Sequence, residues 1–536
     1  MTQMLDRAPA DSCQAVATDF QAEPEEAAER LEHCAARLAA LGVRVDGAGG
    51  LRRLTLPGGG SATLALTRPA DLRGHHAGTH TLLLIVEDAD GVSGADRATI
   101  EAMIRVVEEV SFTAYESAAL DAQLPLMLGM AEDYRARQPL AGVALILTGH
   151  FVTDLVPMVD AAIALGVPAE SITVLRKEYA YKMRRRIDAS LAARGVRTWP
   201  VGQVAEAVRD HAERAATLGL RCLAIDDGGY ILPALLTEAA DVQAAYVGVV
   251  EQTMSGIFKL EPFAALPVPV LAVAQSRLKA SIESTWIADT AIFNILDILP
   301  DEKPEGQPAL ILGYGNIGAA IAGILRNRGM RVAVYDRDLV RLISAHETGY
   351  LTGTSLTDLL AEHRPLLVIG TTGRTSLTEE HYAVLRRDCF LASVSSRNTE
   401  FDLPALAARA ESVVDLGRIG YRYRLGDHVN VTVLADGYPV NFHQADSVTK
   451  SHSDLICAAL LLGACVLADN GHGFVNGHNV ARTDAVLDAS GLLTAYYELY
   501  GPKSDAPAIG RSLNPELYRP RPLGITTCDV LARTCG

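Results

Sequence analysis

The stretch 309-ALILGYGNIGAAIAGILRNRGMRVAVYD-336 decides the fold of this chain. It opens with a short apolar run typical of a buried strand, and the pattern G-x-G-x-x-G follows at 313–318. An amphipathic segment comes next, and a second apolar run ends in Tyr335-Asp336. A strand, a glycine-rich turn, a helix and a second strand that ends in an acidic residue form the fingerprint of a dinucleotide-binding βαβ unit.

The glycines of this motif each have a physical role. Gly313 permits the tight turn, Gly315 lets the backbone approach a pyrophosphate, and Gly318 lets the helix pack closely on the strand. The pyrophosphate sits at the helix N-terminus, where unpaired N–H groups and the helix dipole favour an anion. Asn316 and Ile317 lie in the same turn and are further candidate contacts to the cofactor.

Asp336 indicates which dinucleotide is bound. Its carboxylate can accept hydrogen bonds from the adenosine ribose and repels a 2′-phosphate, so NAD is favoured over NADP. Arg337 follows directly and weakens this preference. The alternative is a glycine-rich turn that binds no ligand.

Strands and helices alternate on both sides of the motif. Apolar runs typical of strands lie downstream at 366–373 and 389–395, and upstream at 143–149, 172–176, 221–227 and 269–274. This pattern predicts an α/β chain with two doubly wound parallel-sheet domains, a Rossmann-like NAD domain and a substrate domain. The predicted boundaries are 116–300 for the first part of the substrate domain, 301–440 for the NAD domain, and 441–536 for an apolar helix that returns to the substrate domain and a C-terminal tail.

Residues 1–115 form a predicted N-terminal extension, a small α/β unit without a catalytic constellation. Residues 1–25 are polar, and we expect them to be mobile. The periodicity then predicts helices at 26–41 and 95–110, and strands at 51–56, 62–67 and 81–86.

Composition limits the function classes. The net charge of −16 argues against a general nucleic-acid binder, which needs a basic face. No apolar run reaches the roughly 20 residues of a membrane span, and the N-terminus lacks the pattern of a secretory signal. The eight cysteines contain no CxxC pair, which excludes the usual zinc spacings, so no metal is predicted. A cytoplasmic enzyme with a small-molecule substrate is expected.

Several motifs together resemble a known family. GYGNIG, LAIDDGG, VEQTMSG, SRLKASIES and TTG are similar, in this order, to motifs of the S-adenosylhomocysteine hydrolases, and 124–154 resembles the family's opening segment. The likeness covers about 116–536. It implies a permanently held NAD that oxidises the substrate's 3′-hydroxyl and makes the 4′-proton acidic. The 5′-substituent then leaves, water adds, and the ketone is reduced again.

The resemblance assigns catalytic roles to four residues. His150 matches an acid/base for the group at C5′, a task that suits an imidazole with a pKa of ~6.5. Asp227 matches the catalytic aspartate, and Lys279 matches the lysine that takes the proton of the 3′-hydroxyl. Glu283 stands where the family has an aspartate after this lysine. The alternatives are a packing histidine at a strand end and a surface lysine.

The resemblance also selects substrate and cofactor contacts. The predicted substrate-binding residues are Asp154, Glu251, Gln252, Ser284 and His443. The further cofactor contacts are Thr253, Ser255, Thr371, Thr372, Asn441 and Tyr518, the last from a tail that in the family reaches the cofactor of a neighbouring protomer. We therefore expect a homodimer or homotetramer.

Departures from the family concentrate in the substrate half. Gln252 replaces a glutamate, Ser284 an asparagine, Tyr230 an aspartate and Ser396 a histidine, for which His443 or His452 are candidate substitutes. Because polar contacts to ribose give steep discrimination, these exchanges indicate a changed substrate rather than lost redox chemistry.

One basic cluster has no counterpart in the family. Arg176-Lys177 and the run 182–186, which contains Arg184, Arg185 and Arg186, occupy a stretch that is neutral there. Such a cluster could bind a phosphate or carboxylate of the substrate. A solvated helix face is the alternative.

We therefore expect an NAD-dependent, redox-neutral enzyme for a nucleoside-type substrate. It is either a hydrolase of the S-adenosylhomocysteine type or a lyase or dehydratase of specialised metabolism that does not add water again. The alternatives are a net dehydrogenase or epimerase of a nucleoside or sugar, and an inactive NAD-binding regulator.

Overall fold

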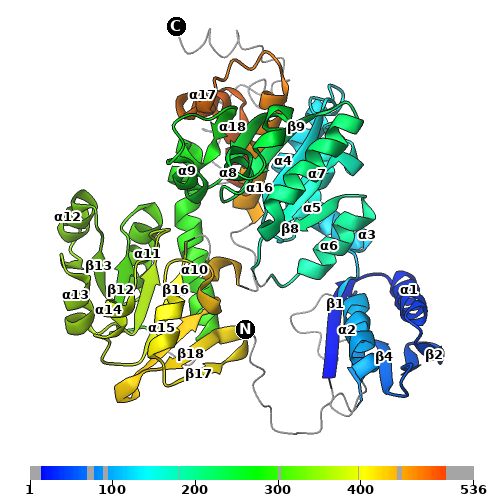
Figure 1. Cartoon of the computed structure of the whole chain (residues 1–536), viewed down its shortest axis with the longest axis horizontal. Helices are drawn as coiled ribbons and strands as arrows, with labels where there is room; N and C mark the ends of the chain where they lie inside the picture. Colours follow the sequence, from blue (N-terminus) through cyan, green and yellow to red (C-terminus); the bar gives the residue numbers. More distant parts are fainter. Residues whose placement is uncertain are drawn as a thin grey trace, which may run out of the picture. The chain divides into compact units, whose positions relative to one another are not determined.

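The computed structural model describes residues 14–68, 78–87, 94–179, 181–299, 303–395, 398–443 and 450–501. The chain divides into two compact units, which are residues 1–123 with 183–197, and residues 124–182 with 198–536. Each is described by itself below, and Figure 1 shows the elements of both.

The first unit is a five-stranded antiparallel sheet with helices packed on it. The strand order is β1-β5-β4-β3-β2, with bounds Gln14–Gln21 (β1), Arg44–Asp46 (β2), Leu51–Thr55 (β3), Ser61–Thr67 (β4) and Thr79–Val86 (β5). The helices are α1 (Pro24–Ala40), α2 (Gly94–Glu108), α3 (Ala114–Asp121) and α6 (Arg184–Ala193). Leu82 and Leu84 of β5 pack against Leu31 of α1 and Met103 of α2 in one core.

The N-terminal strand corrects one expectation. Residues 14–21 are β1, which pairs antiparallel to the whole of β5, and Phe20 is fully buried. The prediction that 1–25 are mobile was wrong for this part, because pairing with a distant strand stabilises a sequence with little apolar periodicity of its own. The predicted helices and strands between 26 and 110 are present as α1, β3, β4, β5 and α2.

The second unit contains a seven-stranded sheet in the order β20-β11-β10-β9-β6-β7-β8. Its strands are β6 (Val143–Gly149), β7 (Thr173–Arg176), β8 (Arg197–Pro200), β9 (Arg221–Asp226), β10 (Tyr246–Glu251), β11 (Pro269–Ala272) and β20 (Gly477–His478). The pairings among β6, β7, β9, β10, β11 and β20 are all parallel.

Helices cover both faces of this sheet. They are α4 (Pro125–Arg135), α5 (Leu155–Ala164), α7 (Val204–Thr217), α8 (Ile231–Leu236), α9 (Met254–Leu260), α16 (Lys450–Ala468), α17 (Val480–Ala489) and α18 (Leu492–Tyr500). Val249 of β10 shares a core with α7 and α8, whereas Val250 lies against Gly463 of α16. Successive side chains of a strand point to opposite faces, so α16 and α7 lie on opposite sides of the sheet.

Helix α16 is long and apolar enough to cross a membrane by length and composition, with a mean hydropathy of 1.7 in its best window. Of that window, 78% is buried within the protein. The helix contacts β9, β10, α4 and α18, as the core helix of an α/β layer does.

The second unit also contains an eight-stranded sheet in the order β14-β13-β12-β15-β16-β19-β18-β17. Its strands are β12 (Pro308–Leu312), β13 (Arg331–Tyr335), β14 (Leu351–Thr352), β15 (Leu367–Gly370), β16 (Cys389–Ser393), β17 (Ser412–Asp415), β18 (Gly420–Arg424) and β19 (Asn430–Leu434). The first six, from β14 to β19, are parallel and reproduce the 3-2-1-4-5-6 order of a Rossmann fold, which β18 and β17 extend antiparallel. The α/β class with doubly wound parallel sheets is thus confirmed.

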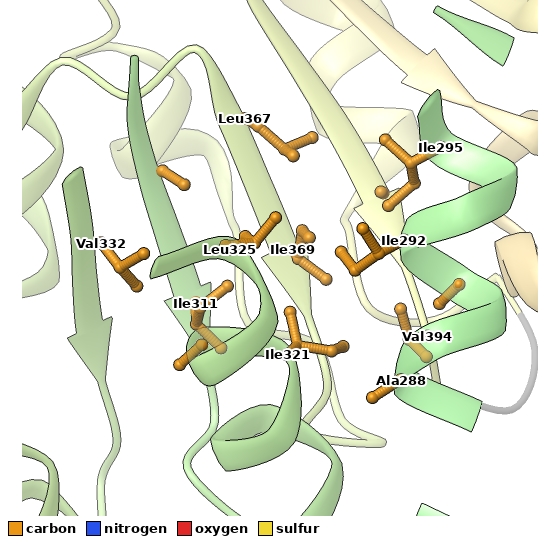
Figure 2. Close-up of a cluster of buried hydrophobic side chains, with 14 of the residues drawn as sticks. Ala288, Ile292, Ile295, Ile311, Ile321, Leu325, Val332, Leu367, Ile369 and Val394 are labelled. Atoms are coloured by element: carbon orange, nitrogen blue, oxygen red, sulfur yellow. The ribbon is translucent and has the colours of Figure 1, made fainter. Parts of the chain in front are cut away.

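The helices of this sheet are α10 (Ser284–Ile298), α11 (Asn316–Asn327), α12 (Leu339–Glu347), α13 (Leu356–His363), α14 (Glu379–Tyr382) and α15 (Leu403–Arg409). Figure 2 shows the core in which Ile292 and Ile295 of α10 meet Ile321 of α11 and Ile369 of β15. Helix α10 directly follows the turn that carries Lys279, so this packing ties that turn to the Rossmann sheet.

Candidate active site

A cavity of about 820 Å³ lies where parallel strands of the seven-stranded and the eight-stranded sheet end. In the seven-stranded sheet His150 directly follows β6, Asp227 follows β9 and Gln252 follows β10, so neighbouring parallel strands deliver them to one edge. The described residues of its wall include these predicted for the site: His150, Asp154, Asp227, Gln252, Thr253, Ser255, Lys279, Glu283, Ser284, Gly315, Asn316, Ile317, Thr371, Thr372 and Asn441.

His150 is held on every side. Its Nε2 lies 3.1 Å from Lys177 Nζ and 3.4 Å from Asp227 Oδ2, and its Nδ1 lies 2.6 Å from the Tyr181 hydroxyl. The ring stacks on Phe442 with centroids 3.5 Å apart. Burial and then the Lys177 ammonium hold the pKa of His150 well below 6.5. The imidazole is therefore neutral at cellular pH, more firmly than its ordinary pKa had led us to expect.

Lys177 lies beside His150 and Asp227, although the sequence analysis named it only as part of the basic cluster. It directly follows β7, its side chain is 1% exposed, and its Nζ lies 2.6 Å from Asp227 Oδ1. Burial opposes ionisation of Asp227, but Lys177 and then His150 outweigh it and lower the pKa of this carboxyl. The sequence does place Lys177 directly after a predicted strand, as it does His150. The neighbouring basic residues led us to consider Lys177 only as part of a cluster.

Lys279 and Glu283 form an ion pair of 3.0 Å within a single π-helical turn, Lys279–Glu283, ahead of α10. A π turn places residues four apart on a widened face and is frequent at functional sites. Both side chains line the cavity, and Glu283 is 9% exposed. The arrangement keeps an ammonium and a carboxylate together at the wall.

The glycine-rich loop has the backbone that its motif requires. Gly313 has a φ of +97°, and a Cβ on Gly318 would lie 1.9 Å from the Gly313 carbonyl oxygen. Asp336 accepts hydrogen bonds from the N–H groups of Tyr314 (2.6 Å) and Asp338 (2.8 Å). Its carboxylate therefore lies beside the loop, at the place where a dinucleotide's ribose would be recognised.

A second turn faces this loop across the switch point of the sheet. Thr371 Oγ1 donates to the carbonyls of Leu312 (3.0 Å) and Gly313 (3.1 Å), and Thr372 Oγ1 donates to Glu400 Oε1 (2.7 Å). Glu400 is fully buried and also accepts the Gly373 N–H (3.1 Å). The sequence analysis did not select Glu400, although it supports the turn from below.

The described residues fit a bound dinucleotide. Asn441 is 3% exposed, lines the cavity, and its Oδ1 has no hydrogen-bond partner among the residues that the structure describes. A buried unpaired amide oxygen costs free energy unless a ligand donates to it. Arg341 of α12 lines the wall next to Gly315 and adds a cation where a pyrophosphate would lie.

The predicted hydroxyl cluster after β10 is local. Thr253 Oγ1 lies 3.1 Å from Ser255 Oγ and donates to Glu251 Oε1 (2.8 Å). Glu251 does not line the cavity; burial and the neighbouring Asp226 raise its pKa well above the usual range. Glu251 thus supports the turn from behind the described cavity wall.

Asp154 lines the cavity but is already paired. Its carboxylate accepts from the Lys450 ammonium and the Ser453 hydroxyl, both on α16. Ser284 Oγ bonds back to Ala280 O at 3.4 Å, and the backbone N–H of Gln252 donates to Asp226 O.

Other predicted residues lie elsewhere. His443 Nε2 contacts the Arg418 carbonyl (2.6 Å), and His452 stacks on Trp286; neither belongs to the described cavity wall. Arg186 is 4% exposed and pairs with Glu116 within the first unit, so it is neither a substrate ligand nor part of a solvated face. Tyr518 and Ser396 lie outside the described residues. Among the residues described, no group of three or more His, Cys, Asp or Glu side chains could hold a metal.

Part of the chain matches a known family. Residues 295–447 match the model of the S-adenosyl-L-homocysteine hydrolase, NAD binding domain. The matched segment contains the glycine-rich loop, the Thr371–Gly373 turn and Asn441.

Curated relatives resemble a longer part of the chain. S-inosyl-L-homocysteine hydrolase of Methanosarcina acetivorans is 26% identical over 290 residues, which are 52% of this chain and 70% of that protein. The S-inosyl-L-homocysteine hydrolase of Methanopyrus kandleri is 23% identical over 353 residues, covering 65% and 82%. An uncharacterized protein of Mycobacterium tuberculosis is 28% identical over 355 residues, covering 62% and 66%.

Among solved structures, a dipicolinate synthase chain from Bacillus halodurans gives a TM-score of 0.35 at 13% identity and covers 62% of this chain and 99% of its own. The NADPH-dependent glyoxylate/hydroxypyruvate reductase from Sinorhizobium meliloti gives 0.35 at 15% identity, with coverage of 64% and 97%.

Proposed function

Because the chain is a divergent member of the S-adenosylhomocysteine hydrolase superfamily with an NAD-binding domain, we propose that it is a redox-neutral NAD enzyme for a nucleoside-type substrate. The reaction oxidises the 3′-hydroxyl transiently and eliminates the 5′-substituent. One observation carries the proposal. The same cavity is lined by His150, Asp227 and Lys279 and also by the glycine-rich loop and Asn441.

The chain offers three contacts for the cofactor. The loop 313–318 would hold the pyrophosphate at the start of α11, Asp336 the adenosine ribose, and Asn441 the carboxamide end. When bound, NAD supplies the reversible oxidation of a sugar hydroxyl.

Lys279 is the proposed acceptor of the 3′-hydroxyl proton. Its ion pair with Glu283 at 3.0 Å holds Lys279 at the cavity wall. The Lys279 ammonium can pass a proton to the Glu283 carboxylate, which leaves a neutral amine that can accept the proton of the hydroxyl. Positioning a base within hydrogen-bond reach of the hydroxyl is the main requirement for general base catalysis.

His150 and Asp227 are the proposed groups on the 5′ side of the sugar. His150 faces the departing group as a neutral imidazole, and the ionised Asp227 carboxylate beside it is the group that can take up a proton. Once the 3′-carbon is a ketone, the 4′-proton is acidic enough for such weak bases to remove.

The substrate is proposed to be a 5′-substituted nucleoside other than S-adenosylhomocysteine. Asp154 is bound by Lys450 and Ser453, so its carboxylate is not a free acceptor for a substrate amino group. Tyr230 replaces a carboxylate, and the Lys259 ammonium lies 4.0 Å above its ring. S-inosylhomocysteine, the substrate in the names of two relatives, is the first candidate to test.

The test is incubation of the NAD-loaded protein in deuterated water with S-inosylhomocysteine, S-adenosylhomocysteine and a panel of other nucleosides. Mass spectrometry is expected to find deuterium at C4′ of one recovered substrate, because only 3′-oxidation makes that position exchange. The Lys279→Ala variant is expected to lose the exchange while it still binds NAD.

Other outcomes would decide for the alternatives. Accumulation of reduced nicotinamide would indicate a net dehydrogenase, and NAD binding without exchange of any nucleoside would indicate a regulatory protein. Conversion of S-adenosylhomocysteine to adenosine and homocysteine would contradict the changed substrate. Water labelled with oxygen-18 distinguishes a hydrolase from a lyase, because only a hydrolase adds the oxygen of water to C5′ of the product.

A further inference from the structure

Lys177 lies behind the part of the cavity wall that His150 and Asp227 form. Its side chain is 1% exposed, with Nζ 2.6 Å from Asp227 Oδ1 and 3.1 Å from His150 Nε2. His150 and Asp227 belong to the described cavity wall, whereas Lys177 does not. Any influence of Lys177 on a substrate therefore passes through these two side chains.

The contacts of His150 determine its tautomer. An ammonium has only N–H donors, so Nε2 must be the acceptor of its 3.1 Å contact with Lys177. The hydrogen then sits on Nδ1 and is donated to the Tyr181 hydroxyl at 2.6 Å. Stacking on Phe442 holds the plane of the ring.

The charges around the ring are balanced as long as the ring is neutral. The titratable groups that face His150 are Lys177, Asp227, Tyr179 and Tyr181, with Lys279 exerting a weaker repulsion. Lys177 and Asp227 supply one positive and one negative charge. A protonated His150 would bring a second cation next to the Lys177 ammonium in a buried place and would remove the acceptor at Nε2.

We propose that Lys177 is a positioning residue that fixes His150 as a neutral imidazole, protonated on Nδ1, across the whole working range of pH. The step that His150 serves rests on the proposed function; its fixed protonation state does not. Without the ammonium, burial would still disfavour the charged imidazole, but the Asp227 carboxylate 3.4 Å away would no longer be balanced and would raise the pKa of His150.

The test measures the state of His150 directly. Diethyl pyrocarbonate acylates only neutral imidazole, and peptide mass spectrometry gives the rate at His150 between pH 5.5 and pH 8. In the wild-type protein the rate is expected to be slow and independent of pH. In Lys177→Met and Lys177→Gln it is expected to rise at pH 8 and to fall about tenfold or more toward pH 5.5, because the unbalanced Asp227 carboxylate then favours the protonated imidazole.

Two further variants complete the experiment. Lys177→Arg keeps the cation and is expected to restore the flat profile. Lys259→Met removes another partly buried lysine, which donates to Gly228 O and Gly229 O, and controls for the structural cost of such a loss. Its profile is expected to stay flat.

Once a substrate is found, the pH dependence of kcat/KM can be measured for the same variants. In Lys177→Met and Lys177→Gln, kcat/KM is expected to fall at acidic pH. A wild-type protein that shows the tenfold fall would overturn the proposal, as would folded Met and Gln variants with flat profiles. Acylation needs no substrate, so the result can be interpreted even if the proposed function proves wrong.

Discussion

At the scale of single residues, the dinucleotide loop depends on the missing side chain of Gly318. A Cβ there would lie 1.9 Å from the Gly313 carbonyl oxygen, which is backbone and cannot move aside without opening the turn. The motif thus requires glycine at this position for close packing of the helix on the strand and not for an unusual φ.

Gly318→Ala is accordingly expected to weaken NAD binding at least tenfold and to lower the melting temperature. Gly323→Ala is the matched control, because its Cβ on the same helix α11 would meet nothing closer than 4.0 Å. This control is expected to bind NAD normally and to be slightly more stable, since alanine favours helix. Titration calorimetry measures the affinity, and equal losses in both variants would contradict the steric explanation.

His211 of α7 makes stability depend on pH. It is fully buried with Nδ1 2.9 Å from Thr173 Oγ1, and burial, with Arg214, lowers its pKa from 6.5 to about 3. As the pH falls below about 6.5, His211 therefore becomes protonated in the unfolded chain but stays neutral in the folded chain. The stabilisation is complete above this pH and is lost as the pH falls toward about 3.

Between pH 7 and pH 5 this group alone is expected to remove about 2 kcal/mol of stability. His211→Gln should reduce that dependence, seen as a smaller fall in melting temperature over the same interval. His346→Gln, which changes an exposed histidine, should leave the fall as in the wild-type protein. Identical pH dependence in His211→Gln and wild type would show the assignment to be wrong.

At the scale of elements, Asp454 of α16 caps a helix to which it does not belong. Helix α4 begins with Pro125, so Leu126 and Met127 carry its first free N–H groups. Asp454 accepts both at 2.8 Å, and the Tyr500 hydroxyl of α18 donates to it at 2.6 Å. One fully buried carboxylate thus joins three helices on the α16 face of the sheet.

Asp454→Ala is expected to lower the free energy of unfolding by about 2–4 kcal/mol, because it leaves buried donors without acceptors. Asp454→Asn should cost less, since its amide oxygen still accepts one of them. Glu498→Ala removes an exposed carboxylate of α18 and should change stability very little. Denaturant unfolding gives the order, and a cost for Asp454→Ala no larger than that control would disprove the cap.

At the scale of the whole molecule, α6 belongs to the first unit although it lies within the sequence of the second. Arg186 holds it there: its guanidinium donates to Glu116 at 2.5 and 3.0 Å and to Val110 O at 2.9 Å. The neighbouring Arg185 is about half exposed and pairs with Glu108.

Arg186→Met is expected to destabilise the first unit by about 3–5 kcal/mol, the cost of breaking a buried ion pair, and Arg185→Met by at most about 1 kcal/mol. Hydrogen exchange should show lost protection in α2, α3 and α6, whereas the affinity for NAD should not change. A parallel loss of NAD affinity would show that the effect of the substitution is not confined to the first unit.

The family, the cofactor and the α/β class were predictable from the sequence because their signals are local. A glycine-rich turn between a strand and a helix is specified by neighbouring residues, and apolar periodicity reports how a short segment is buried. These signals led to Gly313, Gly318 and Asp336 and to the alternation of strands and helices.

What the sequence by itself determined, then, is which elements form and which turn can accept a dinucleotide. The tertiary structure decided which side chains meet: it placed Lys177 between His150 and Asp227, paired Asp154 with Lys450, kept His443 away from the cavity and added β1 to its sheet. The physical reason is that such contacts join residues distant in sequence. Which of these residues meet depends on the order of the strands in the sheet and on which strand ends lie at the same edge. The local periodicity of a sequence specifies neither.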